Sequence, residues 1–197
     1  MTRTLRLLQL VPDTDAGEDS ERALALHEVL AGSGQHVRTL ALAPGRTGGL
    51  TAVLPVLAPG RRTFAALTAV RSESRWADAV VLHSVRSIPP GLARLRSLPP
   101  VVLVVTRAGS EDRRVRSLAR GCDLTLLQLT DDPASTDAGA GSDAGAGSDA
   151  GAGSDEGAGS DGGAAPVEVQ GARTVLVPSA AGTRELAALL LTAVAGP

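Results

Sequence analysis

Short aliphatic runs recur along the chain and alternate with segments of helical pattern, and this alternation restricts the possible fold more than any other feature. Several of the runs are continuously apolar rather than alternating between apolar and polar residues. Strands with this pattern are expected to be covered on both faces, as the strands of parallel sheets are. We therefore expect strands of a parallel sheet at Leu5–Val11, His36–Leu42, Leu50–Leu57, Ala79–His83, Val101–Thr106, Leu124–Leu129 and Thr174–Val177.

Helical patterns fill most of the intervals between these runs. In the first interval Asp19 or Ser20 is a candidate N-cap, and Gly32 and Gly34 are suited to end the helix. Strands that alternate with helices in this way predict a doubly wound, mainly parallel, Rossmann-like α/β sheet, whose ligand is expected at the carboxyl ends of the strands. Further helices are expected over Thr63–Ser74, Ser110–Arg120 and Thr183–Val194.

A low-complexity segment interrupts this pattern between residues 131 and 166. Four hexapeptides follow one another there, DAGAGS from residues 137, 143 and 149 and DEGAGS from residue 155. Their largest apolar side chain is Ala, so they cannot bury the area that would offset the entropy cost of ordering. We expect a disordered linker at 131–166, between a Rossmann-like domain at 1–130 and a final strand and helix at 167–197 that dock back on that domain.

The charges of the chain are distributed unevenly. All 19 basic residues are Arg, and residues 131–170 carry nine acidic side chains and no basic one, so the remainder has 19 basic and 12 acidic residues, a net charge of +7. Such an Arg-rich body can attract a phosphorylated ligand or an anionic membrane surface, although a solvated surface balanced by the acidic segment explains the same charges. Phe64 and Trp76 are the only aromatic residues, so stacking platforms are missing and we expect no nucleic-acid partner.

Several kinds of site are disfavoured by the residues present. The chain has no Lys and hence no P-loop, and Gly32–Gly34 follows a helix rather than a strand, unlike a dinucleotide fingerprint. His27, His36 and His83 are scattered, so we expect no metal site and no cofactor. Cys122 is the single cysteine, which favours the reducing cytoplasm. No apolar run reaches about 18 residues, so no transmembrane segment is expected and any membrane contact is peripheral.

The loop after the first strand is the most suggestive segment for binding. It runs from Pro12 to Ser20, contains Gly17, and opens the first helix at the edge where a ligand is expected. The free N–H groups of a helix N-terminus suit a phosphate, but the loop is acidic, and carboxylates suit hydroxyl groups better. The sequence therefore predicts either hydroxyl recognition or a solvated turn here, with carboxylates at Asp13, Asp15, Glu18 and Asp19.

A family resemblance follows the same order of elements. The first strand with its Gly-containing loop, the turn after the first helix, the Asp–His run of the fourth expected strand and a later Pro-Val-Val-Leu strand resemble the N-terminal, acceptor-side domain of GT-B glycosyltransferases of the family 4 group. The resemblance covers about residues 3–107. It rests on Leu5–Val11, Asp15–Glu18, Gly34 with Val37, Ala77–His83, Leu92–Arg96 and Pro100–Leu103.

The chain departs from that family in three places. Gly17 is followed by Glu18, where the family commonly has paired glycines. Thr106 and Arg107 stand where the family often has a His that faces the sugar-transfer site. No part of these 197 residues corresponds to the second domain of the family, which binds the nucleotide sugar. We therefore expect a domain that is not active alone.

The resemblance implies the acceptor-binding half of a nucleotide-sugar-dependent transferase, working with a separate nucleotide-sugar-binding subunit. Its ligand would be a sugar or a phosphorylated hydroxyl acceptor. Gly17 and Glu18 in the first loop, His83 at a strand end and Arg107 after the next strand are then the expected acceptor-binding residues, and they should converge at one edge of the sheet. The alternative is a non-catalytic α/β ligand- or protein-binding module. An independent Rossmann-type enzyme is disfavoured by the absent phosphate fingerprints.

Overall fold

The computed structural model describes eight stretches of the chain. They are residues 4–47, 49–58, 64–95, 98–106, 110, 112–130, 169–178 and 181–195. The expected linker at 131–166 and the candidate residue Arg107 lie outside the described residues.

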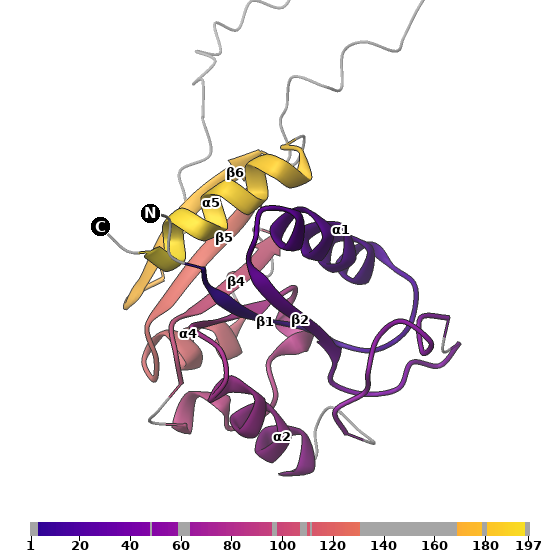
Figure 1. Cartoon of the computed structure of the whole chain (residues 1–197). Coiled ribbons are helices and arrows are strands. Elements are labelled where there is room, and N and C mark those ends of the chain that lie inside the picture. Colours follow the sequence, from indigo (N-terminus) through magenta and orange to yellow (C-terminus); the bar gives the residue numbers. More distant parts are fainter. Residues whose placement is uncertain are drawn as a thin grey trace, which may run out of the picture.

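A six-stranded sheet forms the centre of the molecule, and all its neighbouring strands are parallel (Figure 1). The strand order is β2-β1-β3-β4-β5-β6, so the final strand extends the same sheet beside β5. This arrangement confirms the predicted parallel, Rossmann-like α/β fold. The strands are β1 (Arg6–Val11), β2 (His36–Ala41), β3 (Ala79–Leu82), β4 (Val101–Thr106), β5 (Leu124–Thr130) and β6 (Ala172–Pro178).

Helices cover both faces of the sheet. In Figure 1, α1 and α5 lie over one face and α2 and α4 over the other. Two single 3₁₀ turns, η1 (Val85–Ser87) and η2 (Leu92–Arg94), follow β3. The helices are α1 (Glu18–Gly32), α2 (Phe64–Ser74), α4 (Arg113–Ala119) and α5 (Thr183–Ala195).

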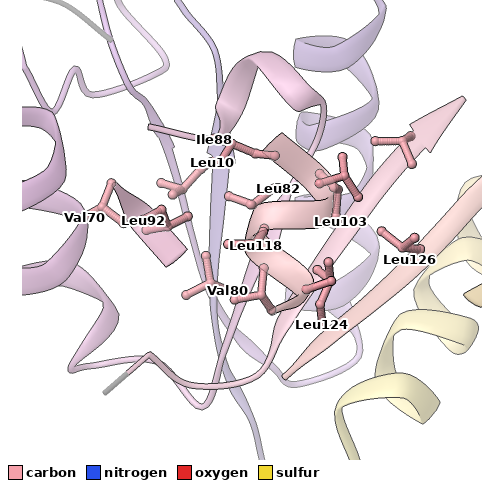
Figure 2. Packing of buried hydrophobic residues seen from close by; sticks show 14 of the residues in the cluster. Leu10, Val70, Val80, Leu82, Ile88, Leu92, Leu103, Leu118, Leu124 and Leu126 are labelled. Carbon is pink, nitrogen blue, oxygen red and sulfur yellow. The ribbon is translucent and has the colours of Figure 1, made fainter. Parts of the chain in front are cut away.

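The alternation of side chains along each strand gives an aliphatic core on either face of the sheet. Leu8 and Leu10 of β1 join the core on the side of α2 and α4, part of which is drawn in Figure 2, whereas Leu7 joins the core under α1 and α5. Both faces of β3 are buried. Because helices cover both faces of the sheet, an inner strand needs apolar side chains on both faces, and this explains the continuous apolar runs.

The expected strand at Leu50–Leu57 is wrong. Most of this run forms turns, in which the Leu54 N–H donates to the Leu50 carbonyl oxygen at 2.8 Å, and Pro55 has no N–H to offer a sheet ladder. Only Val56 makes an isolated parallel bridge to Ala41, at the outer side of β2. Burial of Leu54 explains the apolar pattern without a strand.

The expected N-cap of the first helix is also wrong, whereas its end is as expected, with Gly32 as the last helical residue and Gly34 at φ 85°. The N-cap of α1 is Gly17, which makes no side-chain cap hydrogen bond. Ser20 does not cap because its hydroxyl donates to the carbonyl oxygen of Asp15 at 3.1 Å, and Asp19 lies within the first turn. The helix therefore begins at Glu18, one residue before Asp19, the first of the two predicted caps.

The strand order places a switch point between β1 and β3. From β1 the chain crosses to β2 on one side, and it then returns to build β3 to β6 on the other side. The loops that leave β1 and β3 therefore diverge over opposite faces and leave a crevice at the carboxyl edge, the usual position of a ligand in such sheets.

Candidate functional site

A pocket of about 260 Å³ lies at this switch point. The first turns of α1 form one wall, the residues after β3 form another, and the carboxyl ends of β4 and β5 contribute aliphatic side chains. Helix and strand ends, rather than long loops, position most of its surface. The polar lining residues are Glu18, Asp19, Arg22, His83, Ser84 and Arg86.

His83 is the most unusual of these residues because its side chain is completely buried. It directly follows β3, and its Nε2 lies 2.6 Å from Oε1 of Gln9, a buried residue of β1. The carboxamide of Gln9 is oriented by a weak hydrogen bond from its Nε2 to Oγ1 of Thr39 at 3.4 Å. Gln9 therefore presents an acceptor to His83, and Nε2 of His83 carries the proton.

The other ring nitrogen of His83 is free to accept. Nδ1 is buried and has no hydrogen-bond partner among the described residues. Burial, with a further contribution from the positive charge of Arg22, lowers the pKa of His83 to about 3. The imidazole is thus neutral near pH 7, and it offers an unshared electron pair to a ligand hydroxyl or N–H group.

The hydrogen bonds continue from Gln9 to α1. Thr39 Oγ1 accepts from Gln9, so its own proton is available for Nδ1 of His27, which lies 3.0 Å away. Residues of β1, β2 and α1 are thereby connected with His83, directly after β3, in one chain of polar contacts. This chain holds the His83 ring in one tautomer.

Opposite charges balance each other in and beside the pocket. Arg22 forms ion pairs with Glu18 and, at 3.5 Å, with Asp19. Arg86 reaches out of the pocket to Asp13 at 3.2 Å. Arg22 and Arg86 are thus paired with three carboxylates in all. The pocket therefore has no excess positive charge that could attract a phosphate. The pocket suits a polar, uncharged ligand better than an anion.

Asp19 and Ser84 add two further polar groups. Burial raises the pKa of the Asp19 carboxyl, against the opposing effects of the nearby Ser84 hydroxyl and of Arg22. Although Ser84 is close enough to Asp19 to influence that pKa, its Oγ is buried and is not in hydrogen-bonding geometry with any described group. A ligand hydroxyl that enters the pocket could satisfy Ser84 as well as Nδ1 of His83.

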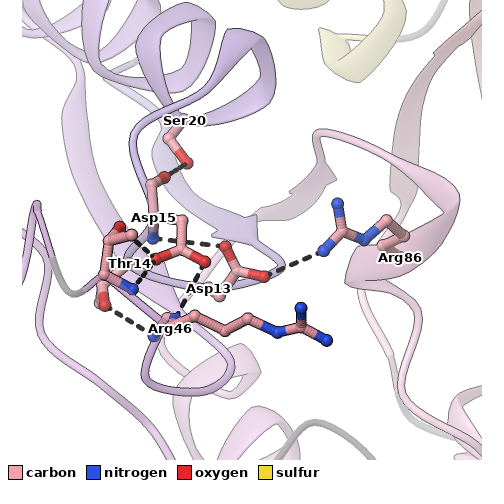
Figure 3. A network of polar contacts seen from close by, with 8 residues as sticks. Asp13, Thr14, Asp15, Ser20, Arg46 and Arg86 are labelled. Carbon is pink, nitrogen blue, oxygen red and sulfur yellow. Dashed lines mark hydrogen bonds and ion pairs between the residues drawn. The ribbon is translucent and has the colours of Figure 1, made fainter.

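The first part of the acidic loop has a structural role (Figure 3). The Asp15 carboxylate accepts hydrogen bonds from the backbone N–H groups of Arg46 at 3.0 Å and Thr47 at 2.7 Å. Oγ1 of the buried Thr14 accepts from the Gly45 N–H at 2.8 Å. These contacts fasten the segment after β2 to the segment after β1. Only the second part of the loop, from Glu18, faces the pocket.

The structure brings two of the four predicted binding residues together. Glu18 and His83 line the same pocket, although they are 65 positions apart. Gly17 directly precedes Glu18 in extended backbone with φ −179°, and a Cβ there would meet no atom within 4 Å, so the chain itself does not require glycine at this position. Arg107, the fourth predicted residue, lies outside the described residues.

Sequence reasoning missed Gln9, Arg22, Ser84 and Arg86. Gln9 had a detectable signal, since it is a polar residue in the middle of an apolar strand and must find a buried partner. Arg22 follows Glu18 by four residues, which predicts an ion pair on a helix but not a pocket. Ser84 and Arg86 follow β3 and gave no signal of their own.

Other kinds of site find little support in the described part of the chain. No group of three or more His, Cys, Asp or Glu side chains is placed to hold a metal ion there. Cys122 donates from Sγ to the Leu118 carbonyl oxygen at 3.2 Å, and burial raises the pKa of its thiol to about 11, which makes it a poor nucleophile. Of the described helices, none has the length and apolar character needed to cross a bilayer.

Comparison with known proteins gives no further guide to the ligand. The chain matches no family model, no curated protein and no solved structure. The resemblance to acceptor-side glycosyltransferase domains consequently rests on the residues named above. The fold and the pocket at the β1–β3 switch point are the observations from which function has to be argued.

Proposed function

We propose that this domain binds a small, uncharged, hydroxyl-bearing molecule in the switch-point pocket, and that it does so as the acceptor side of a sugar-transfer system. The observation that carries the proposal is His83, a residue of the pocket lining whose buried Nδ1 has no hydrogen-bond partner among the described residues. A buried acceptor without a partner costs stability, so a ligand that donates a hydrogen bond to it recovers that loss on binding.

The other polar groups of the pocket fit the same ligand. Guanidinium N–H groups of Arg22 donate, the carboxylate of Glu18 accepts, and the hydroxyl of Ser84 does either. Hydroxyl groups can pair with all of them, because a hydroxyl both donates and accepts. A volume of about 260 Å³ is near the lower end for small-molecule sites and fits one sugar ring or a polyol of similar size.

His83 is suited to orienting a hydroxyl group rather than to removing its proton. A base with a pKa of about 3 takes up a proton only weakly near pH 7. The domain would contribute by holding the acceptor in position, while a separate subunit would bind the nucleotide sugar and stabilise the leaving phosphate. The resemblance to acceptor-side domains supports this division of roles.

Binding is tested with the purified chain by calorimetric titration with a panel of polyols and monosaccharides, and with the phosphorylated counterparts as the comparison. We expect an uncharged member to bind, and His83→Gln to weaken it by roughly tenfold, about 1.4 kcal/mol. His36→Gln is the matched control because His36 is exposed at the start of β2, away from the pocket. Equal affinities of the two variants, or heat from the phosphorylated ligands only, would overturn the proposal.

The transferase role is tested separately from binding. The chain alone should neither transfer nor hydrolyse sugar from a panel of nucleotide sugars with mixed acceptors, and robust turnover by the chain alone would contradict a division of labour with a second subunit. A neighbouring reading frame that encodes a nucleotide-sugar-binding half would favour the transferase role.

The second candidate is a non-catalytic ligand-binding module. The low pKa of His83 favours it, because an imidazole that stays neutral near pH 7 is suited to holding a ligand rather than to acid–base catalysis. The two candidates differ in one measurement: only an acceptor-side domain should convert its bound ligand into a glycosylated product when a nucleotide-sugar-binding partner is added.

A further inference from the structure

The exposed side of α4 carries an arginine surface that the switch-point pocket does not explain. Arg113, Arg116 and Arg120 are exposed and, with Gln170, line a hollow of about 370 Å³. The only hydrogen bond recorded for their side chains in the described part of the protein runs from Nε of Arg120 to the carbonyl oxygen of Arg116, at 3.2 Å. We call these three residues the α4 arginine surface.

The three arginines lie on one side of the helix, and their positive charges are not paired with carboxylates of the described residues. Positions i, i+3 and i+7 lie on one side of a helix, and the opposite side of α4 is buried through Val115 and Leu118. None of the three arginines has an ion-pair partner among the described residues, which is also true of Arg71, Arg75 and Arg184, but only here do three such arginines line one hollow. Like charges at this spacing repel each other, so a bound anion would stabilise the helix.

The chain re-enters the described structure beside this surface. Val169 is buried in the same core as Val115 and Leu118 of α4, and Gln170 lines the arginine hollow itself. The backbone remains close at the next residue, because a Cβ on Gly171 would lie 3.0 Å from the carbonyl oxygen of Ala119. The residues that immediately follow the acidic segment are thus in contact with α4.

Charge and topology indicate what could cover the arginine surface. Residues 131–168 connect β5 to β6, and they contain nine acidic side chains and no basic one. Consecutive parallel strands are joined by right-handed crossovers, and the β4–β5 crossover through α4 already runs over this face. The same handedness directs the β5–β6 connection over the face on which α4 lies.

We propose that the α4 arginine surface is the docking surface for the chain's own acidic segment, residues 131–168. An Asp recurs at every sixth residue, so several equivalent carboxylates can replace one another on the three guanidinium groups. The link to Gln170 holds these carboxylates near the surface at an effective concentration in the millimolar range. The regularly spaced residues are Asp137, Asp143, Asp149, Asp155 and Asp161.

Each contact in this docking is weak and depends on salt. An exposed Arg–carboxylate pair contributes about 0–1 kcal/mol, so docking needs only a fraction of the carboxylates at any time and need not order the segment. The electrostatic attraction between exposed charges extends over about 10 Å at 0.1 M salt and about 3 Å at 1 M salt. The contact should therefore be present at low ionic strength and lost at high ionic strength.

The test uses the full chain with a nitroxide label inside the acidic segment. Ser148→Cys provides the attachment site, and Cys122→Ser removes the native thiol. Broadening of backbone amide signals in an ¹⁵N-labelled chain then reports which residues the segment approaches. At low salt we expect strong broadening over α4 and little over α1, which lies on the opposite face of the sheet (Figure 1). The difference should disappear at about 1 M salt.

Two matched variants separate the arginine surface from overall charge. Changing its three residues to Gln should abolish the preference for α4, whereas the same change at Arg71, Arg75 and Arg184, which are exposed elsewhere, should preserve it. Unchanged amide signals over the sheet show that each variant is folded. Equal broadening of α1 and α4, persistence at high salt, or the same result for both variants overturns the proposal.

A mixing experiment identifies the source of the acidic segment. A chain that carries the nitroxide but no ¹⁵N is added to an ¹⁵N-labelled chain that carries no nitroxide. If α4 is broadened as strongly in this mixture as in the doubly labelled chain, the occupant is a second copy and intrachain docking is refuted. Docking within the chain predicts broadening only when both labels are on the same molecule.

Discussion

Replacing His83 should remove a large part of the pH dependence of stability. In the folded chain burial lowers the pKa of this residue to about 3, whereas an exposed His titrates at 6.5. Between these two values the unfolded chain binds a proton that the folded chain does not bind. The free energy of unfolding therefore falls as the pH falls through this window, and it is fully retained above pH 6.5.

The size of the effect follows from the two pKa values. Each pH unit below 6.5 costs about 1.4 kcal/mol, so the loss attributable to His83 is about 2 kcal/mol at pH 5. At pH 5 this loss in the free energy of unfolding depends chiefly on the pKa of His83 in the unfolded chain. Any pKa below about 4 in the folded chain gives nearly the same loss. Two kcal/mol is a substantial part of the 5–15 kcal/mol that stabilises an ordinary domain.

The assay is urea unfolding of the wild type and of His83→Gln at pH 7.5 and pH 5. The variant is expected to be less stable at pH 7.5, because its side chain fits the site of an imidazole imperfectly. The prediction concerns the difference between the two pH values, which should be smaller by about 2 kcal/mol in the variant. This double difference cancels the contributions of titratable groups that the substitution leaves unchanged. It also cancels Asp19, whose raised pKa acts in the opposite direction.

An equal pH dependence in the two proteins would refute the reasoning. So would a histidine spectrum of the folded chain in which the signal of the His83 imidazole titrates near pH 6.5. A His83 ring that stays neutral at pH 5 with its proton on Nε2 is the expected result, because Gln9 presents an acceptor to that nitrogen.

Three further predictions concern packing and the acidic segment. Gly121→Ala should destabilise the fold by on the order of 1–3 kcal/mol in urea unfolding, since a Cβ there would overlap the backbone of Ala93. Gly32→Ala has open space in α1 and should be neutral or stabilising, so similar losses for both would contradict the packing argument. Leu103→Ala, in the middle of the sheet, should cost about 2–5 kcal/mol by the same assay, and a loss below 1 kcal/mol would place Leu103 outside the core. Shortening 131–166 to about a dozen residues should barely change the melting temperature at about 1 M salt, where the docking on α4 is lost, and a loss of several degrees there would show that the segment packs on the domain by other contacts.

Most of the fold could be predicted from the pattern of apolar residues. Six of the seven expected strands exist because each is an aliphatic run of the length of a strand, and the continuous character of several of them indicated burial on both faces. Leu50–Leu57 has the same composition but fails as a strand. Pro55 interrupts its ladder, and a single buried side chain, Leu54, satisfies its apolar character. Composition alone does not distinguish a strand from a turn that buries one leucine.

The candidate site was predicted in part. A parallel sheet puts the segments after its strands at one edge, which was enough to expect Glu18 and His83 near each other. The same rule did not show that Asp13 and Asp15 are used inside the protein, in contacts with Arg86 and with the segment after β2. Those contacts depend on a loop conformation that has no periodic pattern in the sequence.

The sequence by itself determined the alternation of strands and helices, the parallel sheet and the separation of acidic from basic residues, because each follows from local patterns of side chains. Only the tertiary structure decided what the polar residues do. His83 is neutral because it is buried, and its Nδ1 is the acceptor because Gln9, 74 positions away, faces its Nε2. The three arginines on α4 and at its C-cap form a hollow with Gln170, 50 residues beyond Arg120. Burial, tautomer and charge balance arise from distances between groups far apart in the chain, and these distances exist only once the sheet has assembled.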